Sequence, residues 1–274
     1  MIDKKNILGV GITNATKNEI LEYIVKSLKN FKKKYFIVTP NPEFLVLANK
    51  NLEYKNILNR AELASADGVG VLVAAKILGR PLKERLTGVE LVKSLCKLVS
   101  GKPITVGFLG GRAGVAEMTS ECLQKKYSGL KVNFAGEEWP DSEIDGRRSK
   151  IEGSNLKIED RKSIYPQSST VKSLSSTFNL LPSKSIDILF VAFGAPKQEF
   201  WISENLDKIP VKIAIGVGGA FDYISRNVKR APVWMQNIGL EWLFRLILQP
   251  WRIKRQLSLL KFIWLVFKEK LSRN

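Results

Sequence analysis

Residues 35–43 read YFIVTPNPE, and this stretch joins a predicted strand to a predicted helix. Its four leading apolar residues have the length of a short buried strand. Asn41 can cap the helix that follows, the next proline suits the first helical position, and Glu43 favours the positive end of the helix dipole. The stretch therefore predicts a β–α unit in which polar side chains directly follow a strand.

Two more junctions of this kind follow. Residues 64–70 read ASADGVG, where Asp67 is a lone carboxylate among small and apolar residues, and residues 81–88 read PLKERLTG around Arg85. Open α/β sheets bind ligands at loops that follow strands. Each motif alone has a plain structural interpretation, because Asp-Gly is a common turn pair, Asn41 can be only a cap, and Arg85 can be a surface charge.

The whole chain alternates apolar runs of strand length with helical patterns, which predicts a Rossmann-like, doubly wound and mainly parallel sheet flanked by helices. The strands are expected at residues 7–12, 35–38, 63–66, 104–109, 131–135, 186–193 and 212–217. The helices are expected at residues 15–28, 44–58, 69–78 and 89–99, then up to about 127, and from Pro196 onward. Residues 136–185 are rich in serine and charge, and we interpret them as a divergent, loop-rich insertion.

Glycines follow two of the expected strands, at Gly110-Gly111 and Gly218-Gly219. Glycine lets a phosphate approach backbone N–H groups at a helix N-terminus, so both pairs are candidate substrate-binding turns. Gly110 and Gly111 suit a tight turn equally well. Two further candidates are Lys197 with Gln198, in the first turn of a helix, and Asp222, as either a turn former or a ribose or base contact.

Composition narrows the possible functions. The formal net charge of +18 indicates an anionic partner: nucleic acid, acidic lipid or a phosphorylated substrate. The chain has no histidine, which excludes a Ser-His-Asp triad and leaves acid–base work to carboxylates, lysine or tyrosine. Cys96 and Cys122 lie in apolar helical patterns without metal-ligand spacing, and we expect buried free thiols. We expect neither an export signal nor a membrane-spanning segment.

Composition changes at residue 226, and we divide the chain into a core of residues 1–225 and a helical appendage of residues 226–274. The appendage holds eleven Lys or Arg against two Glu, and four of the six tryptophans. Pro250 predicts two helices, at about 232–248 and 251–271. The last helix places basic residues on one side (Lys254, Arg255, Lys261, Lys268, Arg273) and apolar ones on the other (Leu257, Leu260, Ile263, Trp264, Phe267).

This pattern suits a helix lying on an anionic membrane surface, although a helix docked on the core with a solvated basic face is an alternative. The aromatics lie in a stripe with aliphatics, which suits lipid or core better than base stacking, so we expect no nucleic-acid partner. An exposed apolar appendage can also drive self-association.

Six ordered blocks of the sequence resemble the WecG/TagA/CpsF family of bacterial glycosyltransferases. They are residues 39–43 (TPNPE), 66–68 (ADG), 85–88 (RLTG), 194–199 (GAPKQE), 216–222 (GVGGAFD), and 230–235 (RAPVWM) running into 239–243 (GLEWL). The resemblance covers nearly the whole chain apart from residues 136–185.

The resemblance implies a reaction. It implies inverting transfer of N-acetylmannosamine from UDP-N-acetylmannosamine to the 4-hydroxyl of a polyprenyl-diphosphate-linked acceptor, GlcNAc-diphospho-undecaprenol, at the cytoplasmic face of a bacterial membrane. The product would serve a teichoic-acid-type linkage unit. The family also suggests other UDP-sugar donors, such as the uronic acid of N-acetylmannosamine, or glucose. We expect no cofactor and no metal, since no D-x-D motif is present.

The resemblance also implies roles for particular residues. Asp67 would be the general base, and Arg85 a cation for a phosphate. Sugar-binding positions would be Thr39, Asn41 and Gln198. The appendage would close over the pocket and contribute three arginines, Arg245, Arg252 and Arg255.

Two other functions fit parts of the sequence. An NAD(P)-dependent oxidoreductase would explain the glycine turns, but a convincing G-x-G-x-x-G with its downstream acid is lacking. A non-catalytic lipid-binding adaptor would explain only the appendage, and it would leave Asp67 and Arg85 without a task.

Overall fold

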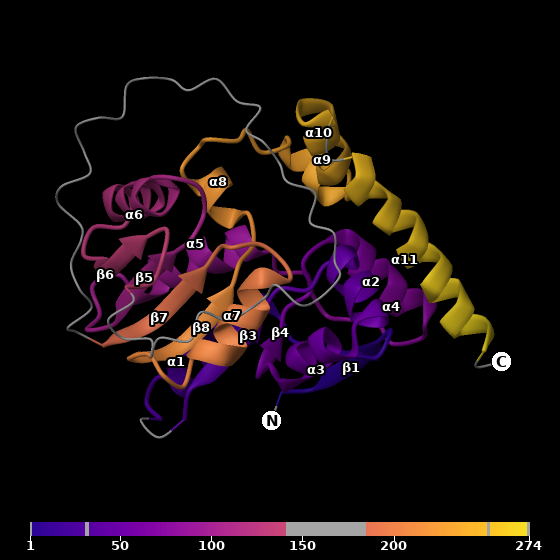
Figure 1. Cartoon of the computed structure of the whole chain (residues 1–274), viewed down its shortest axis with the longest axis horizontal. Coiled ribbons are helices and arrows are strands. Elements are labelled where there is room, and N and C mark those ends of the chain that lie inside the picture. The colour runs from indigo at the N-terminus through magenta and orange to yellow at the C-terminus, as the bar shows by residue number, and fades with distance from the viewer. Residues whose placement is uncertain (1, 31–32, 141–184, 251–252, 273–274) are drawn as a thin grey trace.

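A six-stranded parallel sheet forms the centre of the molecule in this computed structural model, which describes residues 2–30, 33–140, 185–250 and 253–272 (Figure 1). Every pair of neighbouring strands runs parallel, in the order β4-β3-β8-β7-β5-β6. The strands are β3 (Tyr35–Val38), β4 (Leu63–Ala64), β5 (Thr105–Leu109), β6 (Lys131–Gly136), β7 (Ile186–Val191) and β8 (Val211–Gly216). The predicted doubly wound α/β fold is confirmed.

Helices cover both faces of this sheet, and the alternation of side chains along β7 shows the two layers. Ile188 and Phe190 pack into one core, whereas Leu189 and Val191 pack into another on the opposite face. The first face carries α1 (Lys17–Ser27), α5 (Gly88–Val99), α6 (Val115–Lys126) and α8 (Ala220–Ile224). The opposite face carries α2 (Pro42–Lys50), α3 (Leu52–Arg60), α4 (Val69–Ile77) and α7 (Lys197–Asn205).

The single strand predicted at residues 7–12 is wrong. The chain forms a hairpin there, with β1 (Lys4–Ile7) paired antiparallel to β2 (Val10–Thr13) outside the main sheet. Leu8 and Gly9 both have positive φ, 52° and 81°, as a tight two-residue hairpin turn requires. Leu8 is apolar and continues the strand pattern of its neighbours, so the sequence gives no signal of the turn.

Two predicted helices are each divided in the structure. Residues 44–58 split at Asn51, whose side chain accepts the Tyr54 N–H at 2.9 Å and caps a new helix, α3. Residues 232–248 split into α9 (Val233–Asn237) and α10 (Glu241–Leu248) around Gly239. Gly239 has φ 80°, and a Cβ there would lie 2.9 Å from the Cβ of Val69, so this turn packs directly on the start of α4.

The last helix, α11 (Ile253–Leu271), lies along α2 and α4 at the edge of the molecule (Figure 1). It docks through Phe262, Leu265 and Val266, which are nearly fully buried. Near its end the Glu269 carboxylate accepts the Leu8 N–H at 3.1 Å and pairs with Arg80 at 3.3 Å. The predicted apolar side is therefore not the docking stripe.

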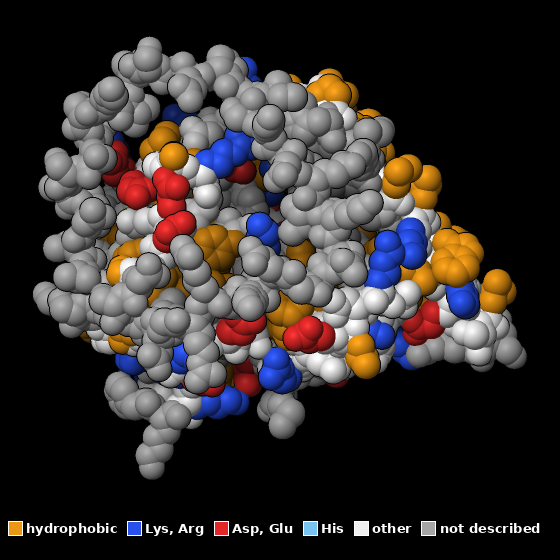
Figure 2. All heavy atoms as spheres, viewed as in Figure 1, with side chains coloured by type: hydrophobic (Ala, Val, Ile, Leu, Met, Phe, Trp, Pro, Cys, Tyr) orange, Lys and Arg blue, Asp and Glu red, His pale blue; other side chains and the backbone are white. Residues whose placement is uncertain are grey.

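That predicted apolar side remains exposed to solvent. Its members are each at least half exposed: Leu257, Leu260, Ile263, Trp264 and Phe267. Figure 2 shows hydrophobic side chains gathered along the edge that α11 forms, beside Lys and Arg side chains. Among the described residues, no helix is long and apolar enough to cross a membrane.

Both cysteines are free thiols, as predicted. Cys96, on α5, is buried in the core, but Cys122 is only half-buried on α6. The predicted insertion at residues 136–185 lies almost entirely outside the described residues.

Candidate active site

A cavity of about 870 Å³ opens at the carboxyl ends of β4, β3 and β8, the three neighbouring strands at one end of the sheet. The loops after these strands line it with residues 39, 41–43, 67–70 and 217–220. Helices α9, α10 and α11 contribute the facing wall. The cavity therefore lies where open α/β sheets bind ligands, and the appendage completes it.

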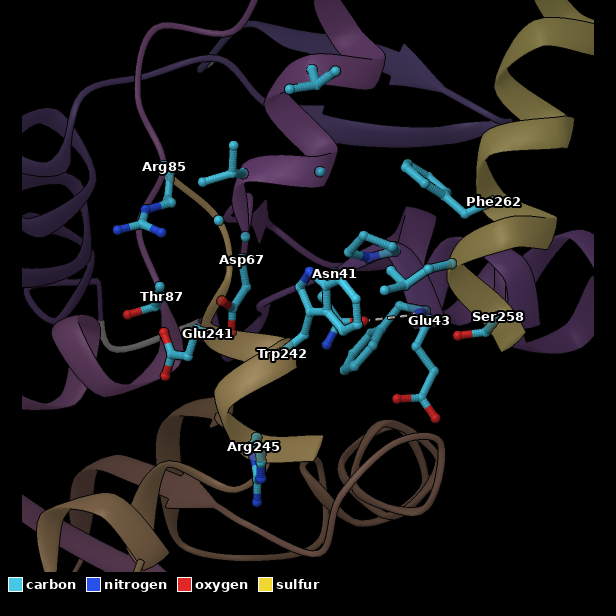
Figure 3. Close-up of a pocket in the computed structure, with 18 of the residues that line it drawn as sticks. Asn41, Glu43, Asp67, Arg85, Thr87, Glu241, Trp242, Arg245, Ser258 and Phe262 are labelled. Atoms are coloured by element: carbon cyan, nitrogen blue, oxygen red, sulfur yellow. Dashed lines mark hydrogen bonds between the residues drawn. The ribbon is translucent and has the colours of Figure 1, made fainter. Parts of the chain in front are cut away.

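Asp67 lies at the centre of this cavity, between Arg85, Thr87 and Glu241 on one side and Asn41 with Trp242 on the other (Figure 3). Its backbone N–H donates to the Pro40 carbonyl at 2.8 Å, which ties the β4 loop to the β3 loop. The Asp67 carboxylate accepts the Gly88 N–H at 3.3 Å, at the start of α5. The side chain is thus held in one place while part of it stays accessible.

The environment of Asp67 makes it a weaker acid than usual. Burial raises its pKa to about 7, and the negative charges of Glu241 and Glu90 act in the same direction. The Gly88 N–H and the positive charge of Arg230 oppose the shift. A carboxylate with this pKa can accept a proton near neutral pH.

Two arginines reach the cavity near Asp67 and are held by the appendage. Arg85 donates from Nη1 to the Gln236 carbonyl of α9 at 3.0 Å. Arg230 donates from Nε to the Glu241 carboxylate of α10 at 3.3 Å. A contact between core and appendage therefore holds Arg85, and a contact within the appendage holds Arg230, in the cavity that contains the candidate base.

A third arginine, Arg245 of α10, lies over the glycine turn that follows β8. Its guanidinium carbon is 5.0 Å from the centre of the Tyr223 ring, and Nη2 is 3.9 Å from the Asp222 carboxylate. A Cβ on Gly219 would lie 3.4 Å from Nη2, so the guanidinium packs directly on this turn. Within the described part of the chain, the buried Nε–H of Arg245 has no hydrogen-bond acceptor. The turn and this arginine form a cradle suited to an anion.

Thr39 and Asn41 both line the cavity, and both also have structural contacts. The Thr39 hydroxyl donates to the Gly216 carbonyl at 2.9 Å, which links β3 to β8 at the mouth of the sheet. The Asn41 side chain accepts the Phe44 N–H at 3.2 Å and caps α2, as predicted. Gly218 and Gly219 line the cavity as well.

Gln198 lies beneath the cavity, fully buried, and does not line it. Its Oε1 accepts the Gly218 N–H at 2.9 Å, while its Nε2 donates to the Glu199 carboxylate at 2.5 Å. The same carboxylate accepts the hydroxyl of buried Tyr54 at 3.2 Å. Gln198 thus supports the glycine turn from below.

Several other predicted substrate-binding residues lie away from the cavity lining. Lys197 is exposed at the start of α7, and the Asp222 carboxylate lies beside the site, 3.9 Å from Nη2 of Arg245. Gly110 packs so closely on Phe193 that a Cβ would lie 2.7 Å from its ring, and Gly111 follows with φ 98°, so both serve a tight turn. Their roles in binding stay predictions. Arg252 and the side chain of Arg255 lie outside the described residues.

Sequence reasoning assigned no role to several residues that the fold brings to the cavity. They are Thr87, Tyr223, Arg230, Glu241 and Trp242. Thr87, Arg230, Glu241 and Trp242 stand inside the blocks that carry the family resemblance, and this was the only signal for them. Among the described residues, no three His, Cys, Asp or Glu side chains form a set that could hold a metal ion.

The fold and the site define a class of protein: a doubly wound α/β enzyme that places a carboxylate with a pKa near neutrality among arginines. Such a site suits group transfer from an anionic substrate. The chain belongs to the glycosyl transferase WecG/TagA/CpsF family, whose model matches residues 5–274.

Three relatives share the name N-acetylglucosaminyldiphosphoundecaprenol N-acetyl-beta-D-mannosaminyltransferase. The Bacillus spizizenii protein is 32% identical over 86% of this chain and 79% of the relative. The Bacillus subtilis protein is 29% identical over 98% of this chain and 93% of the relative. The Staphylococcus aureus (strain MRSA252) protein is 30% identical over 97% and 93%.

Proposed function

We propose that this protein is an inverting glycosyltransferase that moves N-acetylmannosamine from UDP-N-acetylmannosamine to the 4-hydroxyl of GlcNAc-diphospho-undecaprenol. The observation that carries the proposal is the Asp67 carboxylate, held among arginines in the cavity with a pKa raised to about 7. The names of the relatives support the choice of sugar and acceptor. The disaccharide lipid would begin a teichoic-acid-type linkage unit.

Asp67 acts as the general base in this reaction. The acceptor oxygen attacks the anomeric carbon of the donor while Asp67 takes the hydroxyl proton. The bond from the anomeric carbon to the UDP oxygen breaks with inversion, and UDP leaves with the bonding electrons. The Gly88 N–H contact holds the carboxylate for this step.

The departing UDP gains negative charge, and the cavity offers groups that stabilise it. The Arg245 guanidinium and the Gly218-Gly219 turn form one anion cradle, and Arg85 supplies a second cationic group. We propose that these groups replace a metal ion. Thr39 and Asn41 line the same cavity as Asp67, where they can bind the sugar.

We further propose that the appendage binds the cytoplasmic face of an anionic membrane. Support comes from the exposed apolar side of α11, from Lys268 over the Trp264 ring at 5.1 Å, and from the net charge of +18. Because Arg230 and Arg245 belong to the same appendage, membrane binding and completion of the site would be coupled.

The test is UDP release from a panel of UDP-sugars, with and without a GlcNAc-diphospho-polyprenyl acceptor, in the presence of EDTA. We expect acceptor-dependent release from UDP-N-acetylmannosamine, and its loss in Asp67→Asn. Release from a different UDP-sugar would keep the mechanism and change the donor. Absence of release from every donor would contradict the proposal.

A further inference from the structure

The cavity that contains Asp67 has a second, chemically different end between α4 and α11. Apart from Ser258, every described residue that these two helices contribute to the cavity is apolar or glycine. We call this end the α4–α11 groove and define it by Val73, Ala74, Ile77, Phe262, Ile263 and Val266. Figure 3 shows its Phe262 on the side of the cavity opposite Arg85, with Asn41 between them.

The helical periodicity of both walls produces this groove. Val73, Ala74 and Ile77 recur at the spacing of one helix face, and Phe262, Ile263 and Val266 do so on the facing helix. Phe262 and Val266 form a buried floor, whereas Val73 and Ile263 are each 50% exposed at the rim. Exposed apolar rims over a buried apolar floor leave apolar surface that the fold itself does not cover.

Gly70, in the first turn of α4, lines the same cavity as Phe262 and Asp67. A Cβ on Gly70 would lie 3.0 Å from the Pro42 ring and 4.0 Å from the Phe262 ring. The first turn of α4 therefore approaches both the loop that follows β3 and helix α11 closely. The groove and Asp67 lie in one continuous cavity rather than in two separate pockets.

The occupant follows from the proposed acceptor, on which this inference rests. A sugar whose hydroxyl contacts Asp67 is joined through a diphosphate to a long apolar chain, and that chain must leave the cavity without burying its surface against charge. Leu260 and Phe267 also line the cavity, and both belong to the exposed apolar side of α11. An apolar chain can therefore extend from the exposed side of α11 into the groove along apolar side chains.

We infer that the α4–α11 groove binds the first isoprene units of the lipid-linked acceptor. The groove would then select acceptors by the apolar chain behind the diphosphate, in addition to the sugar that Asp67 and its neighbours contact. It would also direct the sugar toward Asp67, because one end of the acceptor is fixed in the groove.

The experiment compares two soluble acceptors without vesicles, so that membrane binding does not contribute. Both carry GlcNAc-diphosphate, one on a methyl group that cannot reach into the groove and one on the three isoprene units of farnesyl. We expect wild type to use the farnesyl acceptor with a kcat/KM about tenfold higher or more, which corresponds to about 1.4 kcal/mol. Val73→Trp fills the groove from its exposed rim and should reduce the farnesyl value to that of the short acceptor, which itself should not change.

The matched control is Leu271→Trp, which adds the same side chain to α11 at a position that is 73% exposed and outside the cavity. It should keep the farnesyl preference. Equal use of both acceptors by wild type would overturn the inference and leave the proposed function standing. An equal loss on both acceptors in Val73→Trp would overturn it as well.

A second readout does not depend on turnover. A diazirine on the farnesyl chain of the acceptor should crosslink to peptides from α4 and α11, and Val73→Trp should abolish that crosslink. Crosslinking to other peptides would overturn the inference, whether or not any donor supports transfer. Absence of transfer from every donor would contradict the proposed function instead. A dimer that Val73→Trp disrupts would instead assign the groove to a second copy of the chain.

Discussion

Asp67 is reachable from the cavity, yet burial and two acidic neighbours raise its pKa to about 7. Because the proposed reaction needs the deprotonated form of Asp67, kcat/KM should rise with pH around pH 7 and level off above it. Steady-state rates measured from about pH 5 to about pH 9 test this expectation. Asp67→Asn should lower kcat by about 100-fold or more at every pH, and a rise retained in that variant would assign it to another group.

The same pKa has a consequence for stability. Since the ordinary value is 3.8 and the folded value is about 7, the folded state binds more protons between these values, and stability falls as pH rises through that window. Asn carries no charge there. The stability of Asp67→Asn relative to wild type should therefore increase from about pH 4 to about pH 7, as urea unfolding would show. A constant difference would contradict the shift.

Glu199 is a second buried carboxyl, beneath the glycine turn, and burial raises its pKa to about 8. It is therefore mostly neutral at pH 7, and Glu199→Gln should preserve stability and activity because the amide keeps an acceptor for Gln198. Glu199→Ala removes the acceptor of the Gln198 Nε2 and of the Tyr54 hydroxyl. It should lower the free energy of unfolding in urea by about 2–4 kcal/mol.

The two Glu199 variants also separate an effect on the position of the glycine turn from an effect on folding stability. In Glu199→Ala, Gln198 is no longer held beneath Gly218. This variant should therefore bind UDP more weakly than Glu199→Gln does, as calorimetric titration would show. Equal UDP affinity in the two variants would show that this network does not position the turn.

At the scale of elements, α11 is fastened to the core by an apolar stripe and by Glu269 near its end. Glu269→Ala removes the acceptor for the Leu8 N–H and the partner of Arg80, which should weaken local docking by about 1–2 kcal/mol. Amide hydrogen exchange should then accelerate in α11 while α7 is unaffected. Glu204→Ala, an exposed acid on α7, is the matched control and should change neither.

Helices α9 and α10 place the cationic groups of the site. Their residues hold Arg85 and Arg230 by hydrogen bonds, and α10 itself carries Arg245. The short turn at Gly239 packs on Val69 and so fixes both helices against α4. The site is therefore assembled from two parts of the chain that are far apart in sequence.

At the scale of the whole molecule, a net charge of +18 combines with exposed apolar side chains on one edge. Vesicles that contain anionic lipid should bind the protein in sedimentation, and raising the salt concentration should weaken binding because it shortens the screening length. Trp264→Glu should reduce binding at low salt. Leu52→Glu, on an exposed position of α3 away from this edge, should not.

If binding were equal with neutral and anionic vesicles, the charge would have no role in it. Loss of binding in Leu52→Glu as well as in Trp264→Glu would show that added negative charge alone explains the effect.

Local patterns in the sequence determined the class of fold and the centre of the site. Apolar runs, caps and proline positions predicted the β–α units, because these signals act between residues that are close in the chain. They also placed Thr39, Asn41 and Asp67 at the ends of neighbouring strands. Patterns of this kind failed where a short turn interrupts an apolar run, as at Leu8, and where an internal cap such as Asn51 divides a helix.

Only the tertiary structure decided which distant residues meet. Arg230 and Glu241 come to lie near Asp67, and Gln198 supports Gly218 from below, although no local pattern joins these positions. Likewise, α11 presents more than one apolar stripe, and the surface of α2 and α4 selects Phe262 and its neighbours for docking. Such contacts depend on how whole elements pack, since complementary surfaces form only after the strands and helices have assembled.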